Sequence, residues 1–451
     1  MQQHAPTSRS AEETAGASAQ IDAYETRTTR SADARSRALR RLPTGISRQT
    51  LFYEPYPFFA RTGRGPFIDD VDGNRYLDLV NNYTSLIHGH AHPATVAAIA
   101  DAAAASSAPG APTELELALA GELAERMPVL EWLRFAVSGS EAVALALRAA
   151  RAFTGRRRIV KFEGGFHGCF DDVQLSIASP PMEPGTFGYG VPASAGLARS
   201  ETIVAVYNDL DSVDAVFERH GGEVAAVIVE PFLGNGALIR AREDFVRRLS
   251  ERTRAHGALL ILDEIQSCRL AYGGAQTSYD VVPDLVTVGK TIGGGMPVAA
   301  FGGRRDVMSA FDGGRPQITQ TGTFTAFPLG IAAGLATLAD WDRQAIERLN
   351  ALGARAREEV GAVFERRGVP AWINGDGSMF NIAFSDAPVD TYRALAATDA
   401  TALGRLHRAL LSEGIYLTAR GTGCLSTPMD DTHLELLTEA VDRALSAVGP
   451  R

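Results

Sequence analysis

The sequence predicts an α/β fold, with a large domain of mostly parallel sheet flanked by helices followed by a small α+β C-terminal domain. Between residues 106 and 340, short apolar runs of strand length alternate with helical patterns. From 341 to 451, helical patterns surround one short strand signal. A chain of 451 residues can hold two or more domains at roughly 100–200 residues each.

Two of the apolar runs are followed by charged groups. Leu259–Leu262 leads into Asp263 and Glu264, and Leu285–Val288 leads into Gly289 and Lys290. Continuous apolar runs are typical of parallel strands covered on both faces, and ligands bind at the carboxyl ends of such strands. A lone lysine at a strand end is usually solvated, and a lone aspartate usually caps a helix. Together, 27 positions apart, they suit pyridoxal phosphate, which uses a lysine and an acidic partner for its ring nitrogen.

A third run, Leu133–Val137, predicts a phosphate site. It breaks at Ser138, Gly139 and Ser140, and a helical pattern follows from Ala142 to Phe153. The free N–H groups and the dipole of a helix N-terminus attract anions. The alternative is that the serine only caps the helix.

Two further strands end in polar and aromatic residues. Arg158–Phe162 precedes Phe166 and His167, and Val224–Val229 precedes Glu230 and then Asn235. An aromatic residue at a strand exit can stack on a flat ring or belong to the core, and the sequence leaves both interpretations open for Phe166.

In this order the motifs resemble the class III aminotransferases of the fold-type I pyridoxal-phosphate superfamily. Among these enzymes the sequence resembles the branch that contains glutamate-1-semialdehyde aminomutase. The resemblance extends from about Gly45 to about Ala444. Its most specific segments are Asp70–Asp78, Gly89–Pro93, Ser138–Ala142, Asp263-Glu264, Pro283–Leu285 and Gly289-Lys290.

The resemblance implies a role for each site residue and a homodimer with shared active sites. Lys290 would be the Schiff-base lysine, and Asp263 the partner of the ring nitrogen of pyridoxal 5'-phosphate. Thr323 would reach the phosphate of the neighbouring subunit. The resemblance also implies Gly139 and Ser140 on the phosphate, Phe166 stacked on the ring and Asn235 near the ring hydroxyl, with Ser138 and His167 as further cofactor-binding residues.

The two ends of the chain look more like the β-phenylalanine aminotransferases than like the aminomutase. The segments that carry this similarity are Ser47–Pro57, Asp263–Leu270 and Ala419–Thr427. In that subgroup arginines hold the substrate carboxylate, which implies this role for Arg48 and Arg420, since a guanidinium binds a carboxylate bidentately. The alternative is that each arginine pairs with a surface carboxylate. Tyr83 and Gln266 are further pocket candidates.

Several positions depart from the family pattern. The aminomutase has a glutamate in the loop before its Leu-Ser-Thr segment, whereas Arg420–Gly423 contains no acid. Many relatives have Asn in place of Ser138, Tyr in place of Phe166, and Gly-Asn in place of Ala326-Phe327. We expect the large ring of Phe327 to reshape the pocket and narrow its substrate range.

Composition excludes several other classes of protein. A formal net charge of −9 argues against nucleic-acid or anionic-membrane binding, and we find no apolar stretch of about 20 residues. Three widely spaced cysteines suggest neither a disulfide framework nor a zinc or other metal site. With no signal-like apolar run near the start, these features favour a cytoplasmic protein whose partners are small molecules.

The pattern divides the chain into four parts. We expect a mobile N-terminal tail (1–40), an arm with a small sheet around a hairpin turn at Asp72-Gly73 (41–105), a large cofactor-binding domain (106–340) and a small domain (341–451). Ser179–Gly190, rich in Pro and Gly, is expected to be irregular and to form a lid. Other expected elements are a basic helix at Asp33–Arg41, helices at Asp399–Leu411 and Asp431–Ala447, and a strand at Ile415–Leu417.

Three functions agree with these observations. The first is an aminotransferase that moves an amino group between a β-amino or related acid and a keto acid. The second is an intramolecular aminomutase or an amino-acid epimerase on the same scaffold, and the third is a non-catalytic cofactor binder. A transaminase consumes a keto acid, whereas a mutase or epimerase needs no second carbonyl compound.

Overall fold

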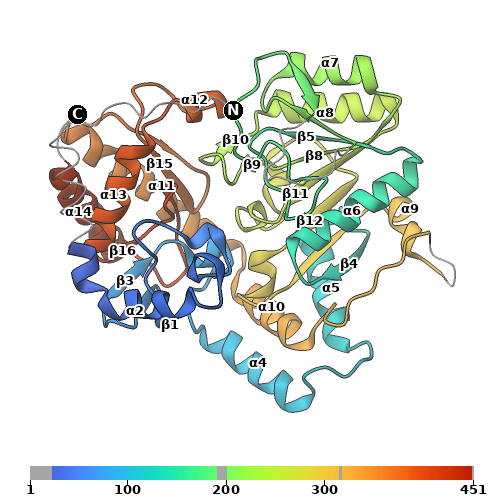
Figure 1. Ribbon diagram of the computed structural model, residues 1–451. Coiled ribbons are helices and arrows are strands. Elements are labelled where there is room, and N and C mark those ends of the chain that lie inside the picture. The colour runs from blue at the N-terminus through green and yellow to red at the C-terminus, as the bar shows by residue number, and fades with distance from the viewer. Residues whose placement is uncertain (1–22, 190–200, 314–316, 449–451) are drawn as a thin grey trace.

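The computed structural model describes residues 23–189, 201–313 and 317–448 (Figure 1). Most of the predicted tail, residues 1–22, lies outside the described residues, as does Gly190 at the end of the predicted lid. The α-helices are α2 (Thr29–Ala38), α3 (Asn81–Thr84), α4 (Pro93–Ala105), α5 (Glu114–Arg126), α6 (Gly139–Thr154), α7 (Leu210–His220), α8 (Glu243–His256), α9 (Arg305–Met308), α10 (Pro328–Asp340), α11 (Arg343–Arg366), α12 (Tyr392–Ala396), α13 (Ala400–Ser412) and α14 (Asp431–Val448).

An eight-stranded sheet forms the centre of the large domain, in the order β4-β13-β12-β11-β8-β5-β7-β6. Strands β12, β11, β8, β5 and β7 run parallel, whereas β13 and the edge strand β6 are antiparallel to their neighbours. The strands are β4 (Trp132–Ala136), β5 (Arg158–Phe162), β6 (Phe187–Tyr189), β7 (Thr202–Ala205), β8 (Val224–Val229), β11 (Leu259–Glu264), β12 (Leu285–Val288) and β13 (Ala299–Gly303).

Alternate residues of these strands face different helices. Leu260 and Leu262 of β11 pack with α7 and α8, which lie together at the top of Figure 1. Leu259 and Ile261 pack on the opposite face with α6 and α9. Because side chains alternate along a strand, Asp263 continues the series that faces α6. Asp263 therefore lies at the end of a strand whose preceding residues belong to the core.

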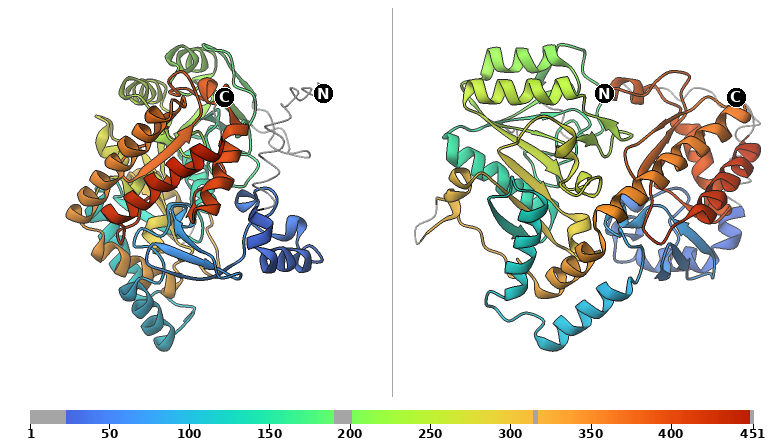
Figure 2. Two further views of the ribbon diagram at one scale, coloured as in Figure 1. Left: turned by 90° about the vertical axis from the view of Figure 1, so that its left-hand side faces the viewer. Right: turned by 180° about the vertical axis from the view of Figure 1, so that it is seen from behind.

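A second sheet joins the two ends of the chain. Strand β16 (Ile415–Tyr416) pairs in parallel with β3 (Arg75–Asp78), which continues through β2 (Phe67–Asp70) to β1 (Ala60–Arg64). The blue N-terminal arm and the red C-terminal elements therefore lie side by side in both Figures 1 and 2. The remaining strands are β9 (Phe232–Leu233), β10 (Ile239–Arg240), β14 (Trp372–Asn374), β15 (Met379–Ala383) and β17 (Thr422–Cys424).

Most predicted elements occur within one or two residues of their expected positions. The turn at Asp72-Gly73 connects β2 and β3, and Asp399 caps α13 by accepting hydrogen bonds from the N–H groups of Thr401 and Ala402. Two expectations were wrong. The basic helix begins at Thr29, four residues before Asp33, and the end of the predicted irregular segment forms β6, because its backbone pairs with the edge of the sheet at β7. The four-part division of the chain stays a prediction.

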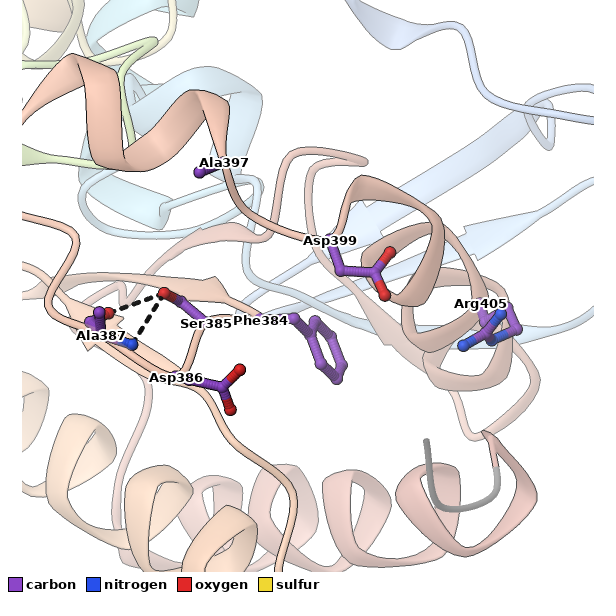
Figure 3. Close-up of a pocket in the computed structure, with 7 residues that line it drawn as sticks. All are labelled: Phe384, Ser385, Asp386, Ala387, Ala397, Asp399 and Arg405. Atoms are coloured by element: carbon purple, nitrogen blue, oxygen red, sulfur yellow. Dashed lines mark hydrogen bonds between the residues drawn. The ribbon is translucent and has the colours of Figure 1, made fainter. Parts of the chain in front are cut away.

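A surface hollow of about 560 Å³ lies in the C-terminal part of the structure (Figure 3). Phe384 and Arg405 line it, together with the loop around Asp386, and none of the predicted site residues contributes to it. The hollow is therefore separate from the strand ends at which the sequence places the chemistry. Among the helices of the described chain, none is long and apolar enough to cross a membrane.

Candidate active site

The carboxylate of Asp263 is held at the end of the central strand β11. The parallel register pairs Asp263 with Thr287 of β12, and the hydroxyl of Thr287 donates to Oδ1 of Asp263 at 3.0 Å. The backbone N–H of Ile265 donates to the same oxygen at 3.2 Å, and Oδ2 lies 2.7 Å from Nδ1 of His167. Asp263 is only 4% exposed, so these donors replace the water that a buried carboxylate loses.

His167 reaches Asp263 from the loop that follows β5. Burial lowers the pKa of His167, although the hydrogen bond to Asp263 acts in the opposite direction. A neutral imidazole then carries its proton on Nδ1 and donates it to the carboxylate, which fixes the orientation of both groups. The structure thus brings together two of the predicted site residues that are 96 positions apart.

Lys290 lies just beyond β12, at the same edge of the sheet. Its φ is +51°, a left-handed backbone conformation that is uncommon for residues other than glycine and that occurs often at functional sites. Burial lowers the pKa of its amine, while the nearby carboxyl groups of Glu230 and Asp263 act in the opposite direction. A lowered pKa favours the neutral amine, which is the nucleophilic form.

The chain contains only one other lysine, Lys161. It is fully buried, and its Nζ donates to the backbone oxygens of Gly165 and Leu175 at 2.9 and 2.5 Å. These bonds brace the loop that carries Phe166 and His167. Lys161 therefore has a structural role, and Lys290 is the lysine at a strand end.

Glu230 joins two of the loops at the site. Its Oε1 accepts from the N–H of Phe166 at 2.9 Å, and its Oε2 accepts from the N–H of Gly234 at 3.2 Å. Burial, followed by the nearby charge of Asp263, raises the pKa of Glu230 to about 8. Phe166 itself is 37% exposed, so it is not a core aromatic residue, and its ring remains accessible for stacking.

The N-terminus of α6 forms the other end of the site. Ser138 caps the helix by accepting from the N–H of Glu141 at 3.3 Å, and the N–H groups of Gly139 and Ser140 have no carbonyl partner within the helix. The Ser140 hydroxyl accepts from the N–H of Cys169 at 3.1 Å. A Cβ at Gly168 would lie 2.7 Å from Ser140, so only glycine permits this approach.

These groups fit the expected cofactor. A buried carboxylate, an amine with lowered pKa and an accessible aromatic ring match a pyridinium ring bearing an aldehyde, and the amides at the helix N-terminus match a phosphate. The fit rests on the types of donor and acceptor at one edge of one sheet.

Within the described residues, the other predicted residues form no hydrogen bond or ion pair with Asp263, His167 or Lys290. Asn235 lies in the partly buried loop after β9, and Thr323 is exposed on the loop before α10. Arg420 is also exposed, in the loop between β16 and β17, where its carbonyl accepts from Asn381 at 2.8 Å. Arg48 donates to Asn82 at 2.5 Å, and the hydroxyl of Tyr83 donates to the carbonyl of Thr50.

The sequence assigned no role to Glu230 or Thr287, although both belong to the cluster. Thr287 could have been identified from the sequence, since it is the one polar residue in the apolar run Leu285–Val288. A polar residue in a buried strand needs a hydrogen-bond partner. Glu230 is visible as an acid at a strand end, but its two backbone partners depend on loop conformations that no local pattern specifies. Gln266 lies against Gly234, with its Oε1 only 1.9 Å from the position of an added Cβ.

Several known proteins are similar to this chain over most of its length. A relative from Desulfitobacterium hafniense named glutamate-1-semialdehyde 2,1-aminomutase is 40% identical over 86% of this chain and 91% of its own length. An omega-transaminase from Sphaerobacter thermophilus has a TM-score of 0.90 and 42% identity, covering 93% of this chain and 97% of its own. A β-phenylalanine aminotransferase from Variovorax paradoxus has a TM-score of 0.89 and 34% identity, covering 96% and 97%.

The class-III aminotransferase family matches residues 51–445 of this chain. This range includes all the predicted site residues except Arg48. The chain belongs to the class-III aminotransferase family of fold-type I enzymes, whose cofactor is pyridoxal phosphate.

Proposed function

We propose that this protein is an aminotransferase that moves an amino group between a β-amino or related acid and a keto acid. One observation carries the choice within the family: the loop between β16 and β17 offers Arg420 and contains no acid. An arginine there suits a substrate carboxylate. The similarity to a β-phenylalanine aminotransferase and to an omega-transaminase supports the same choice.

The contacts in the candidate site suggest a separate role for each of its residues. Pyridoxal phosphate, when bound, supplies an aldehyde that takes up the amino group and a ring that accepts electron density. The neutral amine of Lys290 would accept a proton from the carbon that bears the amino group and carry it on Nζ. Asp263 holds a proton at the ring nitrogen, and His167 and Thr287 keep its carboxylate in one orientation. Gly139 and Ser140 bind the phosphate with their backbone N–H groups.

Arg48 and Arg420 would hold the carboxylate of the substrate. Both are exposed in the isolated chain. No carboxylate of the described residues forms an ion pair with either arginine, which supports a role in binding a ligand over a surface salt bridge. Their full charge is therefore available to a ligand. The amino donor and the keto acid would use the same arginines in alternate half-reactions.

The second candidate is an intramolecular aminomutase, which the 40% identity to a protein named glutamate-1-semialdehyde 2,1-aminomutase favours. It needs the same lysine and aspartate but no second substrate. The absence of an acid from Arg420–Gly423 is our reason for placing it second.

We also propose a homodimer. Thr323 and the neighbouring Phe324, which is 57% exposed, lie on the surface of the isolated chain. A two-fold interface over this loop would bring Thr323 of one subunit to the phosphate site of the other, and two-fold dimers are the commonest closed assembly.

The reaction is tested by its need for a second carbonyl compound. We expect an aromatic β-amino acid to be consumed in equal amounts with 2-oxoglutarate or pyruvate, with no turnover when the keto acid is omitted. Conversion of glutamate-1-semialdehyde without an added keto acid would instead support the aminomutase. Chromatography of both products measures the balance. The Lys290→Ala variant is the inactive control.

Reduction with borohydride should attach the cofactor to Lys290. Peptide mass mapping is decisive here because the only competing lysine is Lys161. We expect the label on Lys290 in the wild type and in Lys161→Arg, and no label in Lys290→Ala, with the far-ultraviolet circular dichroism unchanged in the last variant. A label on Lys161 would overturn the assignment.

Substitution of Arg420 should weaken the use of carboxylate-bearing donors. We expect Arg420→Ala to cost about 2–4 kcal/mol in kcat/KM for amino acids, because a bidentate charged partner is lost, and to leave a simple amine nearly unaffected. Arg443→Ala is the matched control, because Arg443 is an exposed arginine of α14 that pairs with Glu413. Equal losses for both kinds of donor would indicate a structural role for Arg420.

Shared active sites predict recovery of activity in mixed dimers. Lys290→Ala chains and Thr323→Tyr chains should each have little activity alone. A hybrid contains one site with both defects and one site with neither, so activity should reappear after subunits are exchanged. If purified hybrids remain as inactive as the parents, Thr323 does not act across the interface.

A further inference from the structure

The short helix α3 is a left-handed turn beside the candidate active site. Four consecutive residues have positive φ: Asn81 at 45°, Asn82 at 48°, Tyr83 at 55° and Thr84 at 74°. Such values are uncommon for residues other than glycine, and runs of them are rarer still, because Cβ approaches the following carbonyl oxygen. A conformation of this kind persists only where its surroundings hold it in place, and it is frequent at functional sites.

Buried hydrogen bonds hold one side of this turn. The carboxylate of Asp78 accepts from the N–H groups of Val80 and Asn81 at 2.8 and 2.9 Å. The side-chain amide of Asn81, which is fully buried, donates to the carbonyls of Asp78 and Cys424 at 3.0 and 2.9 Å. The start of the turn is therefore fixed to β3 and to the C-terminal strand β17.

The end of the turn is fixed next to the predicted cofactor lysine. The carbonyl of Thr84 accepts from Arg269 and from the hydroxyl of Thr291, both at 3.3 Å. Thr291 follows Lys290 directly in the chain. Arg269 is fully buried, and its second contact, at 2.5 Å, is the carbonyl of Leu425. The turn thus has a fixed position relative to the backbone of Lys290.

The exposed side of the turn holds Arg48. The guanidinium of Arg48 donates from Nη1 to Oδ1 of Asn82 at 2.5 Å and lies 5.2 Å from the centre of the Tyr83 ring. The amide of Asn82 donates from Nδ2 to the hydroxyl of Ser85 at 2.8 Å, which fixes which atom of the amide faces Arg48. Tyr83 is anchored in turn by its hydroxyl, which donates to the carbonyl of Thr50.

The partners of Arg48 orient it without neutralising it. An amide oxygen and an aromatic ring are both uncharged, and within the described residues no carboxylate pairs with this guanidinium. A guanidinium held by neutral groups keeps its charge and its remaining donors for a ligand. An aspartate at position 82 would give the same geometry but would compete with a bound carboxylate.

We propose that Asn82 is a positioning residue for substrate specificity: the left-handed turn presents its amide so that Arg48 is aimed at the substrate carboxylate. The proposal rests on the function proposed above, in which Arg48 binds that carboxylate. Asn82 does not touch the cofactor or the reacting atoms. It selects donors that carry a carboxylate by fixing the group that recognises them.

Replacement by glycine tests the side chain without straining the backbone, since glycine adopts positive φ freely. We expect Asn82→Gly to raise KM for an aromatic β-amino acid roughly tenfold and to change kcat by less than about twofold, as for the loss of a ground-state contact. KM for 1-phenylethylamine, which lacks a carboxylate, should stay the same. The inhibition constant of 3-phenylpropanoate, which has the carboxylate but lacks the amine, should rise together with the KM of the β-amino acid.

Replacement by alanine separates positioning from folding. Asn82→Ala loses the same side-chain contact and also strains the turn. We therefore expect Asn82→Ala to have the same KM as Asn82→Gly but a lower melting temperature. Arg41→Ala is the matched control and should leave KM unchanged, because Arg41 is an exposed arginine of the same arm whose side chain donates to the carbonyl of Arg40.

A double-mutant cycle decides whether Asn82 acts through Arg48. If it does, the double variant Arg48→Ala/Asn82→Gly should have the KM of Arg48→Ala alone. Three results would overturn the proposal for Asn82 only. They are additive effects of the two substitutions on KM, equal rises in KM for the β-amino acid and for 1-phenylethylamine, and an unchanged KM in Asn82→Gly when KM is raised in Arg48→Ala. An unchanged KM in Arg48→Ala would refute the role proposed for Arg48, and with it this inference, while the keto-acid requirement still tests the aminotransferase separately.

Discussion

The buried carboxylate of Asp263 is the constraint on which the rest of the site depends. A charge removed from water is costly unless other groups replace its hydration, and here Thr287, His167 and the N–H of Ile265 do so. Each of these donors comes from a different part of the fold. The β11–β12 register supplies the hydroxyl, the loop after β5 supplies the imidazole, and the end of β11 supplies the amide. The parallel sheet must therefore form in this register before the carboxylate is satisfied.

The same requirement links the neighbouring loops. His167 can reach Asp263 only if the loop after β5 is braced, and the buried amine of Lys161 braces it through the carbonyls of Gly165 and Leu175. Glu230 then connects the N–H of Phe166 in that loop to Gly234 in the next. These contacts lie near or just beyond the carboxyl ends of the parallel strands β5 and β8, so the cofactor side of the site is a direct product of the sheet.

This dependence explains what the sequence could predict. Lys290, Asp263 and the Gly139-Ser140 helix start could all be recognised in the sequence, because each follows an apolar run that the structure shows to be part of a strand of the central sheet. The roles of Thr287 and Glu230 were not assigned, since they depend on register and loop conformation. With only two lysines in the chain, one inside β5 and one after β12, the sequence also held a simpler argument for Lys290.

The proposed substrate side of the site, with Arg48 and Arg420, has a different origin, which is why sequence patterns describe it less well. The pairing of β16 with β3 brings residues more than 330 positions apart into one sheet, with Ile415 opposite Leu77. The turn that holds Arg48 follows β3 directly, and the loop that carries Arg420 follows β16. Both arginines therefore depend on the same long-range pairing. No local periodicity encodes that pairing. The left-handed turn consists of Asn, Asn, Tyr and Thr, so it lacks the glycine that would indicate positive φ in the sequence. In such an arrangement the cofactor side is fixed by the sheet, and substrate choice can change at the chain ends without disturbing the chemistry.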